Sequence, residues 1–298
     1  NLWTEYVQTP ERAQYRVLPR MTALSEVLWS GPGKYSYDDF YGRLIHLQDR
    51  FDELDWAHAP GSFLVSIQTE QENENKGIQV QLTSENPAET IRFTTNGSDP
   101  TAASVEYKSA FTVDNSTTIK AALFIHGKPA GQISEKTIYF HKAVGKTVDY
   151  KTKYQKKYPG NGPSNLVNGT TGSTSYNDGF WQGWERDDLD VVIDLGVRTE
   201  VNQIICGFLE AQNSWIFLPT EIKVSFSDND TSFKNIRSIV LSDGENYSDA
   251  NRVEAKINDI EQVARFLRIT ATNRKTCPDW HNGAGGEAWI FADEIIIN

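Results

Sequence analysis

The first 57 residues carry apolar side chains at the spacing of α-helices. Thr9 is a suitable N-cap, and Pro10 fits the first turn of the helix that follows. Pro19 lacks a backbone N–H, so it predicts a kink or a break in that helix. After residues 31–33, Ser36 can cap a further helix. The two apolar stripes are formed by Ala13, Val17, Met21, Leu24 and Leu28, and by Phe40, Leu44, Leu47, Phe51 and Leu54. Two or three helices and one strand cannot close a core alone, so these stripes need a partner surface.

Residues from about 61 to 140 change to the alternation of β-strands. Ile78, Val80 and Leu82 alternate with polar residues, and the stretches 91–95 and 119–125 repeat the pattern. The turn sequences between strands are Asn96-Gly97, Asp99-Pro100 and His126-Gly127. The pattern predicts a small antiparallel sandwich of immunoglobulin type. Its acids and bases are scattered, so we expect a spacer or a packing module.

Residues from about 142 to 298 are also rich in strands, but their loops are longer. We predict strands at 191–195, 201–209, 222–227, 266–272 and 290–297. The loop from Gly160 to Gly183 is rich in Gly, Asn, Ser and Thr. Trp181, Trp184 and Trp289 border strands, and we predict that these three residues are in the core.

Composition and charge exclude several classes of protein. The 298 residues include 29 Lys plus Arg and 40 Asp plus Glu, which gives a net charge of −11 and disfavours a nucleic-acid partner. A hydrophobic content of 38% is sufficient for packed cores. No apolar run reaches the roughly 20 residues that cross a bilayer. Cys206 and Cys277 allow one disulfide bridge or two free thiols, and no histidine spacing indicates a metal site.

The opening NLWTEY is the sharpest local signal. Residues two apart on a strand point to the same face, so Trp3 and Glu5 would project together. An indole can cover the C–H face of a pyranose, while a carboxylate accepts hydrogen bonds from its hydroxyls. A core tryptophan beside a structural salt bridge is the alternative.

The stretch from Asn1 to Trp29 resembles the end of the catalytic barrel of family 20 glycoside hydrolases, the β-N-acetylhexosaminidases and chitobiases. The matching pieces are Trp3-Thr4-Glu5, Pro19-Arg20, and Ala23-Leu24-Ser25-Glu26 with Trp29. The resemblance implies that Trp3 stacks on an N-acetylglucosamine and that Glu5 binds its outer hydroxyls. Both expectations agree with the rule that barrel sites lie at the carboxyl ends of the strands.

The departure from this family concerns the catalytic pair. In the family, an adjacent Asp-Glu pair on an earlier barrel strand protonates the leaving oxygen and orients the acetamide of the substrate, which acts as the nucleophile. The chain begins after that strand. We reject Asp293-Glu294 as a substitute, because neighbours on a strand point to opposite faces. We therefore expect no catalytic residue in this chain, which would be inactive alone although its parent was an enzyme.

The rest of the chain resembles two further modules. The sequences RFTTNGSDPT and STTIKAALF are similar to the chitobiase C-terminal domain. The stretches 187–196, 221–230, 264–273 and 288–297 resemble the coagulation-factor 5/8 C-type, or discoidin-like, fold. The sugar-binding members of that fold form family 32 of the carbohydrate-binding modules, but other members bind lipids, proteins or nothing.

The resemblance implies a sugar site on the loops at one end of the jelly roll. Trp215, Trp280 and His281 lie in such loops. An exposed platform or a core position remains open for both tryptophans, and an ordinary loop histidine is the alternative for His281. The loop 166–178 occupies the place where many of these modules hold a structural calcium ion. Asn168, Thr174 and Glu294 are its candidate ligands, with a metal-free turn as the alternative. No cofactor is expected for catalysis.

The fold class is thus predicted as mainly β with an N-terminal helical piece. Residues 1–60 would be a barrel remnant, 61–141 an immunoglobulin-like sandwich, and 142–298 a discoidin-like jelly roll. The leading hypothesis is the C-terminal region of a β-N-acetylhexosaminidase, with an appendage that binds N-acetylhexosamine glycans or chitooligosaccharides. The alternatives are a purely structural appendage, or a piece that is active only with the missing barrel. We expect an extracytoplasmic location.

Overall fold

A computed structural model describes the chain except for residues 1, 3–6, 8, 32, 34–35, 60–62, 72–76, 85–89, 126 and 245–248. The chain forms two compact units. The first comprises Asn1–Thr69, Val80–Phe111 and Thr118–Lys136, and the second comprises Glu70–Gln79, Thr112–Thr117 and Thr137–Asn298. The domain boundaries at 60 and 141 stay predictions.

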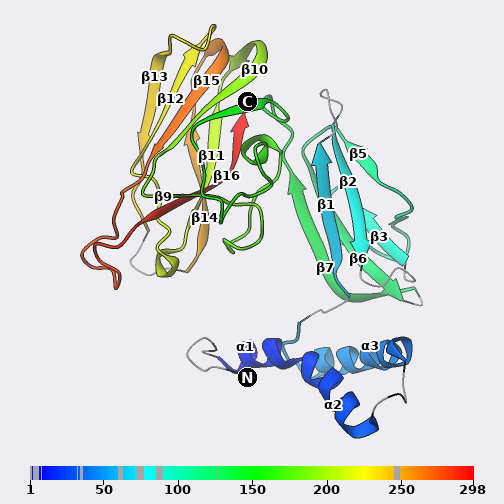
Figure 1. The fold of residues 1–298 in the computed structure, drawn as a ribbon. Helices are drawn as coiled ribbons and strands as arrows, with labels where there is room; N and C mark the ends of the chain where they lie inside the picture. The colour runs from blue at the N-terminus through cyan, green and yellow to red at the C-terminus, as the bar shows by residue number, and fades with distance from the viewer. Residues whose placement is uncertain are drawn as a thin grey trace. The chain divides into compact units, whose positions relative to one another are not determined.

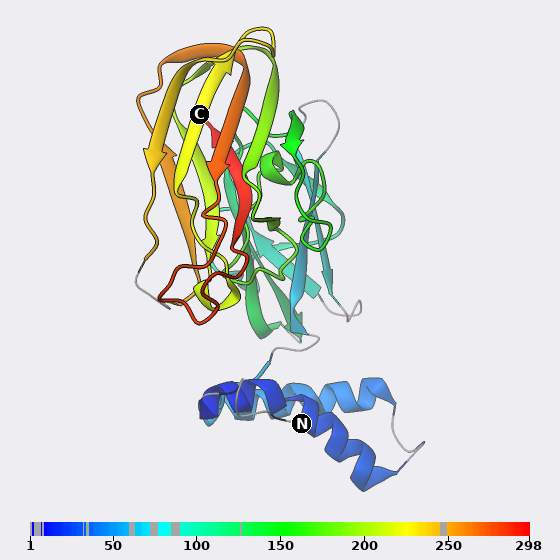
Figure 2. The ribbon, with the colours of Figure 1, turned by 60° about the vertical axis from the view of Figure 1, so that its left-hand side comes forward.

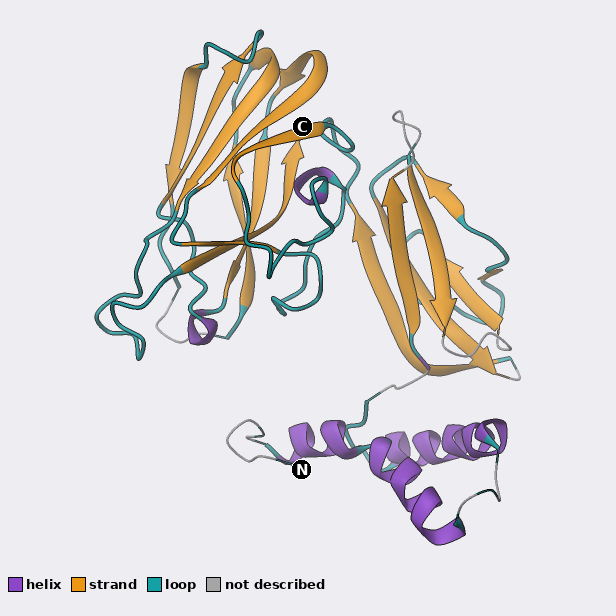
Figure 3. Ribbon diagram, viewed as in Figure 1, coloured by secondary structure: helices purple, strands orange, loops and turns teal. Residues whose placement is uncertain are grey.

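The helices are α1 (Pro10–Val17), α2 (Arg20–Ser30) and α3 (Tyr37–Glu53), shown in purple in Figure 3. Thr9 caps α1 by accepting a hydrogen bond from the Arg12 N–H at 3.2 Å, as expected. Ser36 caps α3 in the same way through the Asp39 N–H. The expected break at Pro19 also occurs, because α1 ends before this residue and α2 begins after it.

The apolar stripes of the helices differ in their exposure. On α3, Leu44 and Phe51 are buried, and Tyr41 stacks on Phe63 with ring centroids 4.9 Å apart. On α2, by contrast, Leu28 and Trp29 are 73% and 91% exposed. None of the helices among the described residues combines the length and apolarity required to cross a bilayer.

Seven strands follow the helices (Figure 1). They are β1 (Val65–Gln71), β2 (Ile78–Ser84), β3 (Thr90–Thr94), β4 (Val105–Glu106), β5 (Phe111–Val113), β6 (Thr117–Ile125) and β7 (Lys128–Ile138). One sheet has the order β1-β2-β5 and the other has the order β4-β3-β6-β7. The alternation of Ile78, Val80 and Leu82 is confirmed, because all three are buried on β2.

The remaining strands form two further sheets. They are β8 (Thr147–Thr152), β9 (Gln182–Glu185), β10 (Leu189–Val201), β11 (Ile204–Glu210), β12 (Glu221–Ser227), β13 (Lys234–Val240), β14 (Asn251–Ile257), β15 (Gln262–Thr272) and β16 (Trp289–Ile297). One sheet has the order β13-β12-β15-β10-β8, and Figure 2 shows several of its strands side by side. The other sheet has the order β14-β11-β16-β9. Residues of both sheets form one buried cluster, so this region is a jelly roll with its core between the sheets.

The five strands predicted for the jelly roll are present within β10, β11, β12, β15 and β16. The prediction missed β8, β9, β13 and β14. The edge strand β13 is exposed along nearly its whole length and therefore shows no alternation. Cys206 and Cys277 are both buried and free, so the bridge considered above is not formed.

Candidate functional site

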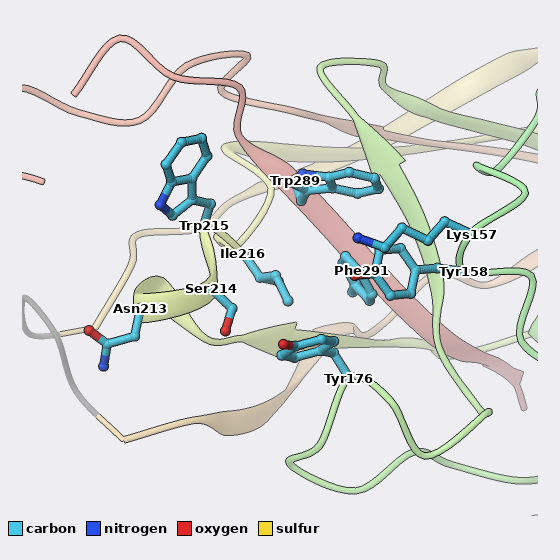
Figure 4. Close-up of a pocket in the computed structure, with 9 residues that line it drawn as sticks. All are labelled: Lys157, Tyr158, Tyr176, Asn213, Ser214, Trp215, Ile216, Trp289 and Phe291. Carbon is cyan, nitrogen blue, oxygen red and sulfur yellow. The ribbon is translucent and has the colours of Figure 1, made fainter. Parts of the chain in front are cut away.

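One end of the jelly roll carries an aromatic pocket of about 350 Å³. The residues that line it come from the loop after β8, the turn after β11 and the beginning of β16 (Figure 4). They are Lys157, Tyr158, Tyr176, Asn213, Ser214, Trp215, Ile216, Trp289 and Phe291. Segments that lie more than 130 positions apart in the sequence thus meet at one end of the fold.

Aromatic rings packed against one another form much of this lining. Tyr158 meets Trp289 edge to face with centroids 5.3 Å apart, and it meets Phe291 at 4.8 Å. Tyr176 meets Tyr158 edge to face with centroids 6.1 Å apart, and its centroid is 6.3 Å from that of Phe291. Gly183 lies directly against Phe291, because a Cβ atom at this position would be 2.9 Å from the Phe291 ring. The missing side chain of Gly183 therefore leaves the space that Phe291 occupies.

Trp215 stands at the rim of the pocket on a backbone that is shaped for it. It follows the short helix η3 (Gln212–Ser214) and has a left-handed φ of 64°, an uncommon conformation for a large side chain. Its N–H donates to Gln212 O at 2.8 Å, and its carbonyl accepts from the Trp289 N–H at 2.9 Å. The indole is 40% exposed. The local backbone thus holds an exposed tryptophan in place.

Two glycines make close contact with the Trp215 indole. A Cβ atom on Gly283 would be 2.7 Å from this ring, and one on Gly286 would be 2.8 Å from it. Any larger residue at either position would therefore displace the indole. These glycines belong to the loop HNGAGG, residues 281–286. Only Trp280 and His281 were predicted as site residues in this region.

His281 was expected as a sugar contact, but the structure places it in the interior, with 4% exposure. Its Nδ1 accepts a hydrogen bond from the Gly283 N–H at 2.9 Å, so its Nε2 carries the proton and donates to Gln212 O at 2.8 Å. The imidazole therefore connects the glycine loop to η3, the two segments that hold Trp215. In this structure His281 is a positioning residue for Trp215 and does not face the pocket.

Trp280 is 39% exposed but does not line this pocket. Its ring packs edge-on against Phe217, with centroids 6.3 Å apart. Of the two tryptophans proposed as platforms, the structure thus brings only Trp215 into the pocket. The assignment of Trp181 and Trp184 to the core is confirmed, since they are 1% and 0% exposed.

Trp289 needs a correction, because it is only partly buried and its indole also lines the pocket. The pocket also contains three residues that were not predicted from the sequence, Lys157, Tyr158 and Tyr176. The two tyrosines could have been found from the sequence, because they lie in loops rich in polar residues and Gly. An aromatic side chain in such a loop is a candidate for binding.

Of the three candidate calcium ligands, Glu294 is buried on β16. Its Oε1 is 2.8 Å from His141 Nε2, and its Oε2 accepts from the N–H groups of Asn168 and Gly169 at 3.2 and 3.1 Å. The His141 Nδ1 accepts from main-chain N–H groups, so its Nε2 carries a proton that points at Glu294. Three N–H donors therefore surround this carboxylate.

Both oxygens of Glu294 thus accept hydrogen bonds from the protein itself. The Asn168 Oδ1 is hydrogen-bonded to Thr170, and Thr174 is exposed. The described residues contain no cluster of three His, Cys, Asp or Glu side chains that could hold a metal ion. Calcium binding by Asn168, Thr174 and Glu294 therefore stays a prediction, as does the metal-free turn.

Burial governs the charge of this group of residues. It lowers the pKa of His141 to about 3. Burial also raises the pKa of Glu294 well above its usual range, with the main-chain hydrogen bonds opposing the shift. The neighbouring Asp293 points elsewhere, and its Oδ2 accepts from Arg252 Nε at 2.6 Å and from the Gly172 N–H at 2.9 Å. The separate partners of Asp293 and Glu294 agree with their rejection as a catalytic pair.

Trp3 and Glu5 lie outside the described residues. Their proposed role in a hexosamine pocket therefore stays a prediction.

Comparison with protein families identifies three modules in chain order. Residues 1–32 match the glycosyl hydrolase family 20 catalytic domain, residues 70–135 the chitobiase/β-hexosaminidase C-terminal domain, and residues 147–290 the F5/8 type C domain. Three stretches of the chain are thus similar to a family 20 catalytic domain, a chitobiase-type sandwich and a discoidin-like jelly roll. These matches confirm both the family resemblances and the fold class expected from the sequence.

A β-hexosaminidase of Porphyromonas gingivalis is 40% identical to this chain over 52 residues. The match covers 17% of this chain and 7% of that relative. Among solved structures, a Streptococcus pneumoniae fucose binding module has a TM-score of 0.37 at 14% identity, covering 53% of this chain and 94% of its own. A CBM32 module from a family 31 glycoside hydrolase of Clostridium perfringens has a TM-score of 0.35 at 21% identity, covering 51% and 90%.

Proposed function

We propose that this chain is the C-terminal region of a β-N-acetylhexosaminidase, and that its F5/8 type C domain binds a glycan in the aromatic pocket. The order of the three matched families supports the first part. The observation that carries the second part is Trp215, an exposed indole held on a left-handed backbone at the rim of a pocket with aromatic walls. Such a site offers flat apolar surface beside polar groups, which is the chemistry that a pyranose ring requires.

In this proposal Trp215 covers the C–H face of one sugar ring. Asn213 and Ser214 supply hydrogen-bonding groups at the same rim, and the tyrosine hydroxyls supply others. Binding by the appendage would hold the enzyme near its glycan and raise the local concentration of substrate. The ligand class is a glycan or chitooligosaccharide that contains N-acetylhexosamine.

For the parent enzyme we propose release of terminal N-acetylhexosamine by substrate-assisted retaining catalysis. Trp3 and Glu5 would contact the sugar, as the family resemblance implies. The Asp-Glu pair of the family would come from a part of the barrel that precedes Asn1, and this chain alone would be inactive. Such an enzyme would meet its glycans outside the cytoplasm, which is the location we propose.

The catalytic part can be tested with an aryl N-acetyl-β-glucosaminide. We expect no turnover by the chain alone and turnover by the protein that includes the upstream region. An upstream region without an Asp-Glu pair on a barrel strand would overturn the assignment to a hexosaminidase.

The binding part can be tested by a glycan array, followed by calorimetric titration of the full chain. We expect Trp215→Ala to weaken binding at least about tenfold, which corresponds to roughly 1.4 kcal/mol. Trp280→Ala is the matched control, because Trp280 has nearly the same exposure, 39% against 40%, but does not line the pocket. It should leave the affinity within about twofold.

Far-UV circular dichroism would verify that both variants are folded. Absence of binding to any amino sugar or galactoside at millimolar concentration would contradict the proposal and favour the alternative, in which the jelly roll is a structural module.

A further inference from the structure

The charge of the aromatic pocket distinguishes it from the rest of the molecule. The chain has a net charge of −11, but the only ionised side chain among the described residues that line the pocket is Lys157. No carboxylate lines it within that described set. A ligand in this pocket therefore contacts a positive group in the lining, while the carboxyl of Glu185, opposite Trp289 in the sheet, lies behind that lining.

The Lys157 side chain belongs to the pocket and does not extend away from it. Its Nζ lies 5.1 Å from the centroid of the Tyr158 ring, and the side chain extends toward Trp289 and Phe291 in Figure 4. Lys153 and Lys156 lie on the same exposed loop but do not line the pocket. The loop thus adds positive charge around Lys157.

The nearest acidic influence on Lys157 is Glu185 on β9. Burial and the adjacent carboxyl of Glu287 raise the pKa of Glu185, and Lys157 opposes that shift. Glu287 in turn pairs with Arg186 at 3.2 Å. Among the described residues, no carboxylate forms a direct ion pair with Lys157, so its ammonium group is available to a ligand.

The neutral groups of the pocket are also biased toward hydrogen-bond donors. An indole nitrogen carries a hydrogen and can only donate, and neither Trp215 Nε1 nor Trp289 Nε1 has an acceptor among the described residues. Trp181 and Trp184, in contrast, donate to the carbonyls of Ser173 and Thr152 at 3.0 and 3.1 Å. The Nε1 edge of the Trp215 indole lies beside Gly283, where a Cβ atom would be 3.0 Å from the nitrogen. An indole N–H without an acceptor in the protein can donate to an acceptor on a ligand.

We propose that the pocket selects sugars that carry an anionic substituent, a carboxylate or a sulfate, over their neutral counterparts. This inference rests on the proposed function, because it names the ligand class of the same site. Lys157 would form a charge-assisted hydrogen bond with the anionic group while the aromatic side chains contact the ring. Because Lys157 is exposed, we expect a preference of about fivefold that decreases as salt is added.

Calorimetric titration of the full chain with matched pairs of ligands tests this proposal. Methyl β-glucuronide is compared with methyl β-glucoside, and N-acetylglucosamine 6-sulfate is compared with N-acetylglucosamine. Tighter binding in the first pair identifies a carboxylate as the preferred group, and tighter binding in the second identifies a sulfate. Either result supports the proposal, provided that the preference decreases at high salt.

Lys157→Gln should abolish the preference, so that each anionic sugar binds this variant no more tightly than its neutral counterpart. Lys153→Gln is the control, because it removes the same charge from the same loop outside the pocket, and it should retain the preference. A preference that survives Lys157→Gln, or neutral sugars that bind equally or more tightly, would overturn the inference while the proposed sugar site stands. Absence of binding to every sugar would mean that the proposed function itself has failed.

Discussion

The jelly roll and the helical segment differ in how completely their buried polar groups are paired and their apolar groups are buried. In the jelly roll, even buried charged groups have partners, such as Arg252 for Asp293 and His141 for Glu294. On the helices, Trp29 is 91% exposed, and the buried Gln48 Nε2 has no hydrogen-bond partner among the described residues. The jelly roll thus pairs its buried polar groups, whereas the exposed apolar residues of α2 need a surface that the described residues do not supply.

This difference shows that an exposed tryptophan can have two meanings. Trp29 lies on a regular helix whose apolar stripe continues through Leu24 and Leu28, so its exposure reflects a missing partner surface. Trp215 is exposed because a left-handed turn and the contact with Gly283 hold it at the rim of a pocket. Only the second arrangement is specific for a small ligand.

The strongest test of the comparison replaces one tryptophan in each region. Trp184 is fully buried and its indole donates to Thr152 O, so Trp184→Ala should lower the free energy of unfolding of the jelly roll by about 3–5 kcal/mol. Trp29→Ala should change stability by less than about 0.5 kcal/mol. Urea denaturation followed by circular dichroism measures both. A similar cost for the two variants would mean that α2 is packed in solution.

A second test exchanges one buried glutamine in each region for leucine. The Gln182 side chain accepts a hydrogen bond from the Tyr150 hydroxyl and donates to the carbonyls of Pro159 and Gly162. Gln182→Leu should therefore lower the free energy of unfolding by about 2–4 kcal/mol. Gln48→Leu removes a buried amide nitrogen that has no hydrogen-bond partner among the described residues. This substitution should raise the free energy of unfolding by about 1 kcal/mol. Thermal denaturation of both variants would show changes of opposite sign. Destabilisation by Gln48→Leu would indicate that this amide has a partner in solution.

The third test concerns the pH dependence of the His141–Glu294 pair. The folded protein keeps His141 neutral, because burial lowers its pKa from 6.5 to about 3, whereas the unfolded chain binds a proton below pH 6.5. The stability that neutral His141 contributes is therefore lost as the pH falls from about 6.5 toward 3. A glutamine at this position does not titrate, and Glu294 is present in both proteins.

The stability difference between the wild type and His141→Gln should therefore shift in favour of the variant by about 1–2 kcal/mol between pH 7 and pH 5. Urea titrations at each pH measure this difference, and a constant difference would contradict the neutral state of His141. Because both oxygens of Glu294 already accept hydrogen bonds from the protein, we expect calcium or a chelator to leave the melting temperature of the wild type unchanged. A higher melting temperature on addition of calcium would indicate that the folded protein binds this ion.

Much of the fold could be predicted because its elements have strong local patterns. The caps at Thr9 and Ser36 and the break at Pro19 follow from backbone chemistry within a few residues. The weakly patterned β13 was missed, since an exposed edge strand needs no apolar face. The candidate site was predicted less completely: Trp215 was identified, whereas Tyr158 and Tyr176 were missed and His281 faces the interior.

The sequence by itself determined which elements form and which faces they bury, because the helical and strand periods record burial residue by residue. It also determined the families of the three modules through motifs that are local in the chain. Only the tertiary structure decided that Lys157, Trp215 and Trp289 share a pocket and that His141 meets Glu294. Such contacts depend on loop conformation and on packing between distant segments. Neither of these produces a periodic pattern of apolar and polar residues in the sequence.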